Sequence, residues 1–504
     1  MSGIQRIAVI GAGTMGRGIV QLFAQAGYRV SCYDAQAGAA DKALEFVAGM
    51  IDRAVSKGRY SQEQGRAIVA RLHLCERLED LAGCDLAIEA VVEDLAVKRQ
   101  LFQSLEAVLD ERAILASNTS SLMVADIAAV CRRPERVAGL HFFNPVPLMK
   151  VVEVIAAVRT AAQTIERLRV LVESSGHRAV VAADQPGFLV NHAGRGLYTE
   201  GLRLLEERVA GVAEIDRLLR EAAGFRMGPF ELLDLTGLDV SAKVMESIYQ
   251  QFHQEPRFRP SSLVAPRIAA GLFGRKSGAG WYVYEGNDRC EPARAAVPAL
   301  PGLWRVWVDP AADDYARLCG LVFEAGMELV EQASDADLLL LQFWGWDVTR
   351  YCAEHGLDAV KAVAIDPLPG LENHRTLMLS SVTRADVRDA AHALLAQGAS
   401  EVTLIGDSCG FVLQRVLATI VNIAADIAQR GIAGVDDIED AVRLGLGYPH
   451  GPLGLGDAIG ARKVLEILTR IHALSGDPRY RPSAWLARRA ALGLPLTTAE
   501  AART

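Results

Sequence analysis

A histidine and a glutamate that could cooperate in proton transfer lie on either side of a short proline-rich segment. His141 stands within an apolar run, and Glu153 stands within a run of β-branched residues. Between them lies Asn144-Pro145-Val146-Pro147, and proline fixes φ and favours extended geometry in the residue before it. The pattern predicts two extended segments joined by a stiff loop, an arrangement that can bring His141 and Glu153 together. A carboxylate beside an imidazole fixes its tautomer and suits it to act as a general base.

A simpler interpretation explains this stretch alone equally well: a hydrogen-bonded core histidine and a glutamate at a strand end. Neighbouring motifs favour a catalytic role for these two residues. The buried strand 85–93 ends in acidic residues, and the next strand, 113–116, stops at Ser117-Asn118-Thr119-Ser120-Ser121. Such small polar residues serve as turns or helix caps, or they hydrogen-bond a substrate oxygen where open α/β sheets bind ligands. Because His141 ends the following strand, we expect these groups on one rim.

A glycine-rich turn near the N-terminus predicts dinucleotide binding. The strand Arg6–Ile10 runs into Gly11-Ala12-Gly13-Thr14-Met15-Gly16, an amphipathic helix follows, and a second strand, 29–33, ends in Asp34. The glycines alone are weak evidence, but strand, glycines, helix, strand and acid stand in the required order. The glycines allow a pyrophosphate to approach the backbone at a helix N-terminus. Asp34 is expected to bind the ribose hydroxyls and to repel a 2′-phosphate, which favours NAD over NADP.

A cluster of cations lies in the predicted helix 39–72. Arg53, Lys57 and Arg59 are close together there. Such a cluster can be the solvated end of a helix, or it can contact a ligand that carries a phosphate.

Composition limits the class of protein. The chain has 504 residues, 51% hydrophobic and 23% charged, and a net charge of −8. Its length predicts three or four globular domains. The charge argues against a nucleic-acid binder. Neither a signal peptide nor an apolar run of about 18 residues is recognisable, so we expect no membrane span. Eight scattered cysteines without Cys-x-x-Cys spacing indicate reduced thiols in the cytoplasm and no metal site.

The second half of the chain repeats the first, and its helical segment recurs at a constant offset of 223 residues. The recurring residues are Asp184, Gly187, Phe188, Gly228, Pro229, Asp234 and Gly237, which return as Asp407, Gly410, Phe411, Gly451, Pro452, Asp457 and Gly460. At a different offset, 299 residues, Arg305–Val308 matches Arg6–Val9. The repeat has lost its chemistry, because the three fingerprint glycines and Asp34 are replaced by Pro310, Ala312, Tyr315 and Ala333.

Other functional positions are lost in the second half as well. The segment around Lys57 is missing, the segment 363–367 replaces the His141 strand without a histidine, and Asn191 becomes Gln414. We therefore expect the second half to be structural. The predicted fold is α/β, with a doubly wound, Rossmann-type sheet, a helical domain and a degenerate repeat of both. The domain boundaries that we expect are 1–183, 184–285, 286–405 and 406–504.

Residues 1 to about 285 closely resemble the NAD-dependent L-3-hydroxyacyl-CoA dehydrogenases. The shared stretches are 11–16, 89–93, 117–122, 141–145, 184–191 and 228–230. The longer form, with a second C-terminal helical domain, is similar to the branch that oxidises 3-hydroxyadipyl-CoA in phenylacetate catabolism. The resemblance implies hydride transfer to NAD, assisted by a His/Glu general base. The alternative is a 3-hydroxybutyryl-CoA dehydrogenase of butyrate or fatty-acid metabolism.

The resemblance also implies roles for individual residues. His141 would be the base and Glu153 its orienting partner, and Ser120 and Asn191 would bind the substrate oxygen. The implied cofactor and coenzyme A contacts are Asp34, Glu93, Lys98 and Asn118 for NAD, and Lys57 for the CoA moiety.

Two rival interpretations and several open points accompany this one. One rival is a dehydrogenase of free β-hydroxyacids, which commonly relies on a catalytic lysine; the other is a non-catalytic NAD-binding protein like the related lens crystallins. A dicarboxylic substrate would need a distal cation, for which Arg195, Arg226 and Lys243 are candidates. In single-copy relatives the helical domain dimerises, so we expect the two helical repeats to pair as an internal pseudo-dimer. A homo-oligomer is also possible.

Overall fold

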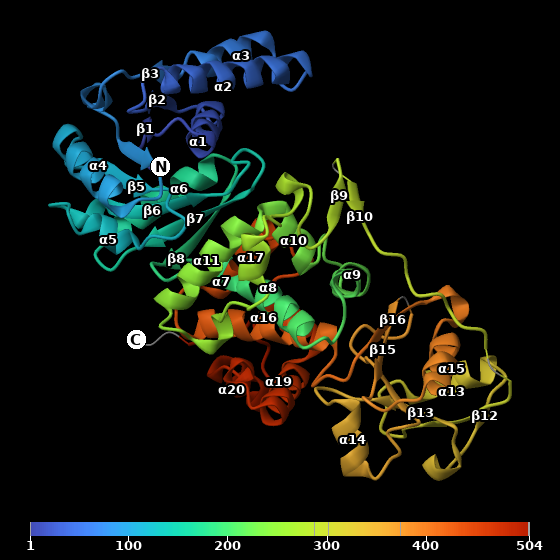
Figure 1. Cartoon of the computed structure of the whole chain (residues 1–504). Coiled ribbons are helices and arrows are strands. Elements are labelled where there is room, and N and C mark those ends of the chain that lie inside the picture. The colour runs from blue at the N-terminus through green and yellow to red at the C-terminus, as the bar shows by residue number, and fades with distance from the viewer. Residues whose placement is uncertain (1, 287, 301, 373, 502–504) are drawn as a thin grey trace. The chain divides into compact units, whose positions relative to one another are not determined.

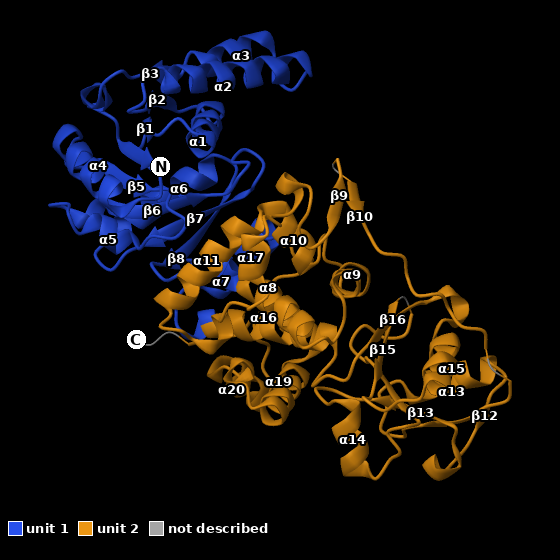
Figure 2. Cartoon of the chain, in the orientation of Figure 1, with its two compact units in different colours: residues 1–193, 427–447 blue, residues 194–426, 448–504 orange. Residues whose placement is uncertain are grey.

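A computed structural model describes residues 2–286, 288–300, 302–372 and 374–501 of the chain (Figure 1). Contacts divide the chain into two compact units (Figure 2). Unit 1 comprises residues 1–193 and 427–447, and unit 2 comprises residues 194–426 and 448–504. A short segment from the second half of the chain thus belongs to the N-terminal unit.

Unit 1 contains an eight-stranded sheet in the order β3-β2-β1-β4-β5-β6-β7-β8. The strands are β1 (Arg6–Ile10), β2 (Arg29–Tyr33), β3 (Leu72–Leu74), β4 (Leu86–Glu89), β5 (Ile114–Ser117), β6 (Val137–Phe142), β7 (Val151–Ala156) and β8 (Arg178–Ala183). Neighbouring strands are parallel except for β6 and β7, which are antiparallel. The predicted doubly wound sheet is confirmed.

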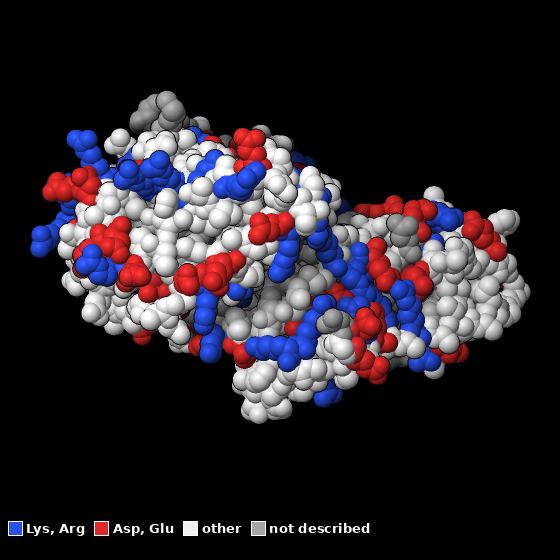
Figure 3. All heavy atoms as spheres, turned by 90° about the horizontal axis from the view of Figure 1, so that it is seen from above, with Lys and Arg blue, Asp and Glu red and all other residues white. Residues whose placement is uncertain are grey.

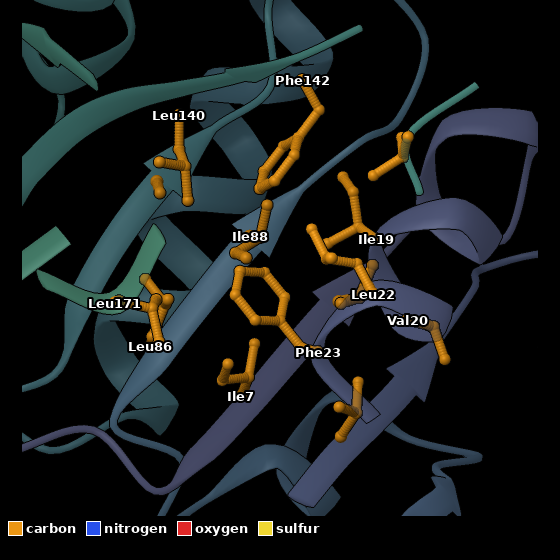
Figure 4. Close-up of a cluster of buried hydrophobic side chains, with 14 of the residues drawn as sticks. Ile7, Ile19, Val20, Leu22, Phe23, Leu86, Ile88, Leu140, Phe142 and Leu171 are labelled. Atoms are coloured by element: carbon orange, nitrogen blue, oxygen red, sulfur yellow. The ribbon is translucent and has the colours of Figure 1, made fainter. Parts of the chain in front are cut away.

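Eight α-helices accompany this sheet. They are α1 (Thr14–Gln25), α2 (Ala39–Ser56), α3 (Gln62–Val69), α4 (Leu95–Val108), α5 (Val124–Ala128), α6 (Ala162–Ser174), α7 (Val190–Ala193) and α17 (Val435–Gly445). Phe23 of α1 packs against Phe142 of β6, with ring centroids 5.9 Å apart, and both lie in the core cluster drawn in Figure 4. Each such buried side chain contributes about 1.5–3 kcal/mol. This packing holds α1, and with it the glycine-rich turn, against the sheet.

One predicted helix is interrupted. The predicted helix 39–72 is two helices and a strand: Gly58 follows α2 with a φ of +70°, and Ser61 caps α3 by accepting a hydrogen bond from Gln64 N. The short strand β3 follows and was not predicted. Later in the chain, Gly194 separates α7 from α8 (Arg195–Glu206), and glycine is among the weakest helix formers.

Unit 2 holds the remaining helices and a second sheet. Its helical part contains α8, α9 (Val212–Arg217), the π-helical segment η3 (Leu218–Ala222), α10 (Pro229–Thr236), α11 (Leu238–Gln251), α12 (Val264–Ala269), α18 (Pro452–Ile459), α19 (Ala461–Ser475), α20 (Ala484–Leu492) and most of α16 (Val412–Gln429). The hairpin of β9 (Val283–Glu285) and β10 (Asp288–Cys290) precedes the second sheet. Short 3-10 turns include η4 (Pro256–Phe258), η6 (Ala333–Asp335) and η8 (Pro478–Tyr480).

The second sheet is a shortened copy of the first. Its strand order is β12-β11-β13-β14-β15-β16, and only β14 and β15 are antiparallel, as β6 and β7 are. Its elements are β11 (Arg305–Val308), α13 (Tyr315–Glu324), β12 (Glu328–Leu329), β13 (Leu338–Gln342), α14 (Val348–His355), β14 (Ala362–Ile365), β15 (His374–Leu379), α15 (Ala385–Leu395) and β16 (Glu401–Ile405). Between β12 and β13 the chain forms only η6, so the counterparts of α2 and α3 are missing there, as predicted.

Helix α16 is a long apolar helix that the sequence analysis did not single out. By length and mean hydropathy, 1.2, it passes as a candidate span, but 83% of it is buried inside the protein. Within unit 2, the buried Arg415 of α16 lies 2.7 Å from Glu200 Oε1 of α8. Its apolar length is explained by its place in the core.

The two repeats exchange a helical segment. In unit 1, Ala183 N donates to Ile432 O at 2.8 Å, and α17 packs on β7, β8 and α7. In unit 2, Gly406 N donates to Val209 O at 2.8 Å, and η3 packs on β15. These residue pairs are equivalent at the offset of 223. The second helical repeat therefore covers the β7–β8 end of the first sheet, and the first helical repeat covers the β15–β16 end of the second sheet.

The surface carries charges of both signs. On the face shown in Figure 3, acidic and basic side chains alternate over the surface and do not gather into one track. All eight cysteines are free thiols, and five of them are buried: Cys32, Cys75, Cys84, Cys131 and Cys352.

Candidate active site

The predicted histidine–glutamate pair forms across two adjacent strands. His141 of β6 and Glu153 of β7 are directly opposite in the antiparallel register, and His141 Nδ1 lies 2.5 Å from Glu153 Oε2. The two side chains are 7% and 0% exposed. Glu153 Oε1 accepts hydrogen bonds from Leu189 N at 2.9 Å and from Val190 N at 2.7 Å. Both carboxylate oxygens are thus engaged, and the ring is held by one of its nitrogens.

This geometry leaves Nε2 as the nitrogen of the imidazole that can accept a proton. A carboxylate accepts the Nδ1–H proton, so in the neutral ring the lone pair is on Nε2. His141 can then take a proton at Nε2, and Glu153 stabilises the imidazolium that forms. The pair has the geometry that a general base with a fixed tautomer requires.

The loop between the two strands is non-helical, as predicted. Residues 143–150 lie in neither a helix nor a strand, and the Asn144–Pro145 peptide is cis. Gly18 of α1 fits against this loop, because a Cβ atom at Gly18 would lie 3.0 Å from Val146 Cβ. Phe143 lies with its ring centroid 4.5 Å from that of His141. The loop therefore adds an aromatic wall to the histidine.

A second group of polar side chains gathers around Glu93. Its Oε1 atom accepts the hydroxyl of Thr119 at 2.6 Å and the backbone N–H groups of Ser120 at 3.0 Å and Ser121 at 3.1 Å. Burial raises the pKa of the Glu93 carboxyl, but Lys98 and the hydroxyls of Thr119 and Ser121 outweigh it and hold the pKa below its usual value. Glu93 orders the loop that presents Ser120.

Lys98 occupies a different position from the one expected of a direct NAD contact. It is buried, and its Nζ atom lies 2.6 Å from Glu89 Oε1 and 3.2 Å from Glu93 Oε2. Ser117 Oγ donates to the other oxygen of Glu89 at 2.6 Å. The ammonium group is surrounded by carboxylates, as a buried cation requires. Lys98 thus contacts Glu93 from within the protein interior.

The two asparagines lie beside these groups. Asn118 Oδ1 accepts a hydrogen bond from Phe142 N at 2.8 Å, which ties the polar loop after β5 to the strand of His141. Asn191 follows Val190, the residue whose N–H binds Glu153, and its side chain is half-buried. Lys57 is exposed at the C-terminal end of α2, and among the described contacts none joins it to this group.

The glycine-rich turn has the geometry that a dinucleotide needs. Gly11 has a φ of +103°, and a Cβ atom at Gly16 would lie 1.7 Å from Gly11 O, so a side chain is excluded at Gly16. Gly13, the N-cap of α1, faces open space and supplies no side-chain cap. A pyrophosphate can therefore reach the first N–H groups of α1. Asp34 accepts Ala12 N at 2.7 Å, which places the carboxylate beside the turn. These residues fit NAD.

Sequence reasoning missed the backbone donors of the site. The N–H groups of Leu189 and Val190 anchor Glu153, but a backbone donor has no residue-type signature. The Glu89–Ser117 hydrogen bond was also missed, although both residues end adjacent parallel strands and so could have been paired.

Comparisons with known proteins agree with this site. Residues 6–185 match the family described as "3-hydroxyacyl-CoA dehydrogenase, NAD binding domain", and residues 187–284 and 410–500 match "3-hydroxyacyl-CoA dehydrogenase, C-terminal domain". The chain is 37% identical, over 98% of both proteins, to a 3-hydroxyadipyl-CoA dehydrogenase of Escherichia coli (strain K12). It is 38% identical to a probable 3-hydroxybutyryl-CoA dehydrogenase of Bacillus subtilis (strain 168) over 56% of this chain and 98% of that one.

A solved structure resembles almost the whole chain. The crystal structure of 3-hydroxybutyryl-CoA dehydrogenase from Escherichia coli K12 superposes with a TM-score of 0.85 and 36% identity, covering 97% of this chain and 99% of that one. The duplicated C-terminal match, the NAD-binding match and the near-full-length relatives all lead to the same conclusion. The chain belongs to the 3-hydroxyacyl-CoA dehydrogenase family, and it is an oxidoreductase that uses NAD.

Proposed function

We propose that the protein oxidises 3-hydroxyadipyl-CoA to the 3-oxo product with His141 as the general base. The 2.5 Å contact between His141 Nδ1 and Glu153 Oε2 is the observation that carries the base assignment. NAD, when bound, supplies the acceptor for the hydride of C3. His141 Nε2 takes the proton of the 3-hydroxyl, and Glu153 holds the ring and its positive charge. Ser120 and Asn191 donate hydrogen bonds to the substrate oxygen.

The remaining site residues bind the two coenzymes. Gly11, Gly13, Thr14, Met15 and Gly16 form the turn for the pyrophosphate, and Asp34 binds the ribose. Glu93 and Asn118 line the nicotinamide end, with Lys98 behind Glu93, while Lys57 binds the CoA phosphates. The open space at Gly13 and the Glu93-centred loop support these assignments.

The choice of acyl chain rests on the relatives. One near-full-length relative is named for 3-hydroxyadipyl-CoA, and a second near-full-length likeness is named for 3-hydroxybutyryl-CoA. The shorter chain is therefore the second candidate. A distal carboxylate would require a cation; Arg226 and Lys243 are exposed, and Arg195 is buried beside the ring of Tyr198.

We further propose four domains, at 1–183, 184–285, 286–405 and 406–504, with the two helical ones paired as an internal pseudo-dimer. Two features within unit 2 support this pairing: the buried Arg415–Glu200 ion pair, and the contact of η4 with η8, equivalent turns of the two repeats. The free, mostly buried thiols support a cytoplasmic location.

The substrate assignment is tested by following NADH oxidation with 3-oxoadipyl-CoA and with acetoacetyl-CoA. The ratio of the two kcat/KM values measures discrimination between the acyl chains. We expect a preference for 3-oxoadipyl-CoA of at least about tenfold, since a hydrogen-bonded or paired terminal group discriminates more strongly than one methylene. A preference for acetoacetyl-CoA would replace the proposal with the short-chain alternative.

A further inference from the structure

A helix from the second helical repeat lies directly behind the catalytic wall of the first half. Within unit 1, α17 packs on β7, which carries Glu153, and on α7, which carries Asn191. Two ion pairs fix the N-terminal half of this helix: Arg178 of β8 lies 2.8 Å from Asp437 and 2.8 Å from Asp440. The helix is therefore held against the strand and the short helix that form the active site.

The C-terminal end of α17 approaches that wall through a glycine. A Cβ atom at Gly445 would lie 3.0 Å from both γ-carbons of Val190 and 3.3 Å from Val151 Cγ1. Such distances are below ordinary van der Waals contact, and closely packed interiors respond to a change of a single methyl group. A side chain at Gly445 would therefore have to displace Val190 or the end of β7.

Val190 is joined to the catalytic groups through its backbone. Its N–H donates to Glu153 Oε1 at 2.7 Å, and Asn191 is the next residue in α7. A shift of Val190 would lengthen its hydrogen bond to Glu153 and move the side chain of Asn191. Both effects would change the geometry around His141, because Glu153 is the residue that orients its ring.

The other half of the molecule gives an internal comparison. The counterpart of Gly445 at the offset of 223 is Ala222, at the end of η3, which packs on β15 of the degenerate sheet. The equivalent position therefore carries a methyl group. Glycine occurs where the interface lies behind the catalytic residues.

We infer that Gly445 is a positioning residue of the active site, through which the second, non-catalytic half of the chain sets the place of Glu153 and Asn191. This inference rests on the proposed roles of those two residues. It gives the duplicated half a function in the reaction of the first half. It also predicts that a small change at the far end of the sequence slows turnover.

The first test replaces Gly445 by alanine in the full-length protein. We expect Gly445→Ala to lower kcat about 3- to 10-fold, because displacements below 1 Å already disturb aligned reacting groups, while KM for NAD changes less than about twofold. Gly434→Ala is the matched control: Gly434 caps the same helix, and nothing lies within 4 Å of a Cβ atom there. Thermal unfolding of both variants reports any purely structural effect.

The second test asks whether the loss passes through Val190 and Glu153. Removing the methyl groups that collide, in Gly445→Ala/Val190→Ala, should recover most of the kcat lost in Gly445→Ala. In a Glu153→Gln background, Gly445→Ala should have a much smaller effect than it has alone, because residues that act together are non-additive.

Three results separate the possible errors. If Gly445→Ala is as active as Gly434→Ala, the inference is wrong. If the loss persists unchanged in both double variants, Gly445 acts by another route and the inference is again overturned. If Glu153→Gln itself turns over normally, the proposed role of Glu153 fails instead.

Discussion

Glu153 shows how a single side chain can be held by two kinds of partner. One of its oxygens faces His141, and the other is fixed by the N–H groups of Leu189 and Val190. A buried carboxylate needs such partners, because an unpaired charge in the interior is costly. The same requirement explains Lys98, which lies between Glu89 and Glu93 and leaves Glu93 to arrange the loop of Ser120.

Asp366 is a residue of the degenerate half that lacks such compensation. It is buried at the end of β14; its Oδ1 atom accepts Leu368 N at 3.0 Å and Gln414 Nε2 at 2.9 Å, and among the described residues its Oδ2 atom has no hydrogen-bond partner. Burial raises the pKa of Asp366 to about 7, although both hydrogen bonds act to lower it.

The direction of this shift predicts a pH dependence of stability. Because the folded-state pKa is above the unfolded one, the stability linked to the protonated form is complete below about pH 4 and is lost as pH rises through 7. Asp366→Asn should therefore raise Tm relative to the unmodified protein more at pH 8 than at pH 5. Asp52→Asn, on the exposed side of α2, is the control. An equal change at both pH values would contradict the assignment.

At the scale of elements, the first βαβ unit was the easiest to predict. The strands Arg6–Ile10 and Arg29–Tyr33 are observed with the bounds that the sequence predicts, because Gly11 follows the first strand, and Gly27 and Asp34 flank the second. The pair of β6 and β7 was predictable for a similar reason: the proline-rich loop between them is short and stiff.

Other elements depend on distant partners that local patterns do not reveal. The packing of α17 on β7, β8 and α7 brings together residues as far apart in the sequence as Ala183 and Ile432. No local propensity specifies such a contact. The hydrogen bonds of Leu189 and Val190 to Glu153 are of the same kind, since any residue type supplies a backbone N–H.

The glycine turn gives a prediction at this scale. Gly13→Ala should fold normally, since nothing lies within 4 Å of its Cβ position, but it should weaken NADH binding about tenfold or more by occupying the space of the pyrophosphate. Gly16→Ala should lower both Tm and binding, because its Cβ atom would collide with Gly11 O. Calorimetry and thermal unfolding distinguish the two; unchanged NADH affinity in Gly13→Ala would exclude this turn as the cofactor site.

At the scale of the whole molecule, the two halves share a fold but differ in the polar groups that they retain. The first sheet keeps its glycine turn, Asp34 and the His141–Glu153 pair, and the second keeps the strand order from β14 to β16 but none of these groups. The exchange of α17 and η3 between the repeats means that each sheet packs against a helical segment of the other half of the chain. The sequence predicts that the second half lacks the glycine turn, the acid and the histidine, whereas the exchange of helical segments is visible only in the structure.

The most direct test of this account is the turnover of His141→Gln with the preferred 3-oxoacyl-CoA, measured together with NADH binding. If His141 is the general base of the single active site in the chain, turnover should fall about 10²–10⁴-fold, and one NADH should still bind per chain with unchanged affinity. Turnover that remains near normal, or that falls only by half, would contradict the account, because another base or a second active site would then have to carry the reaction.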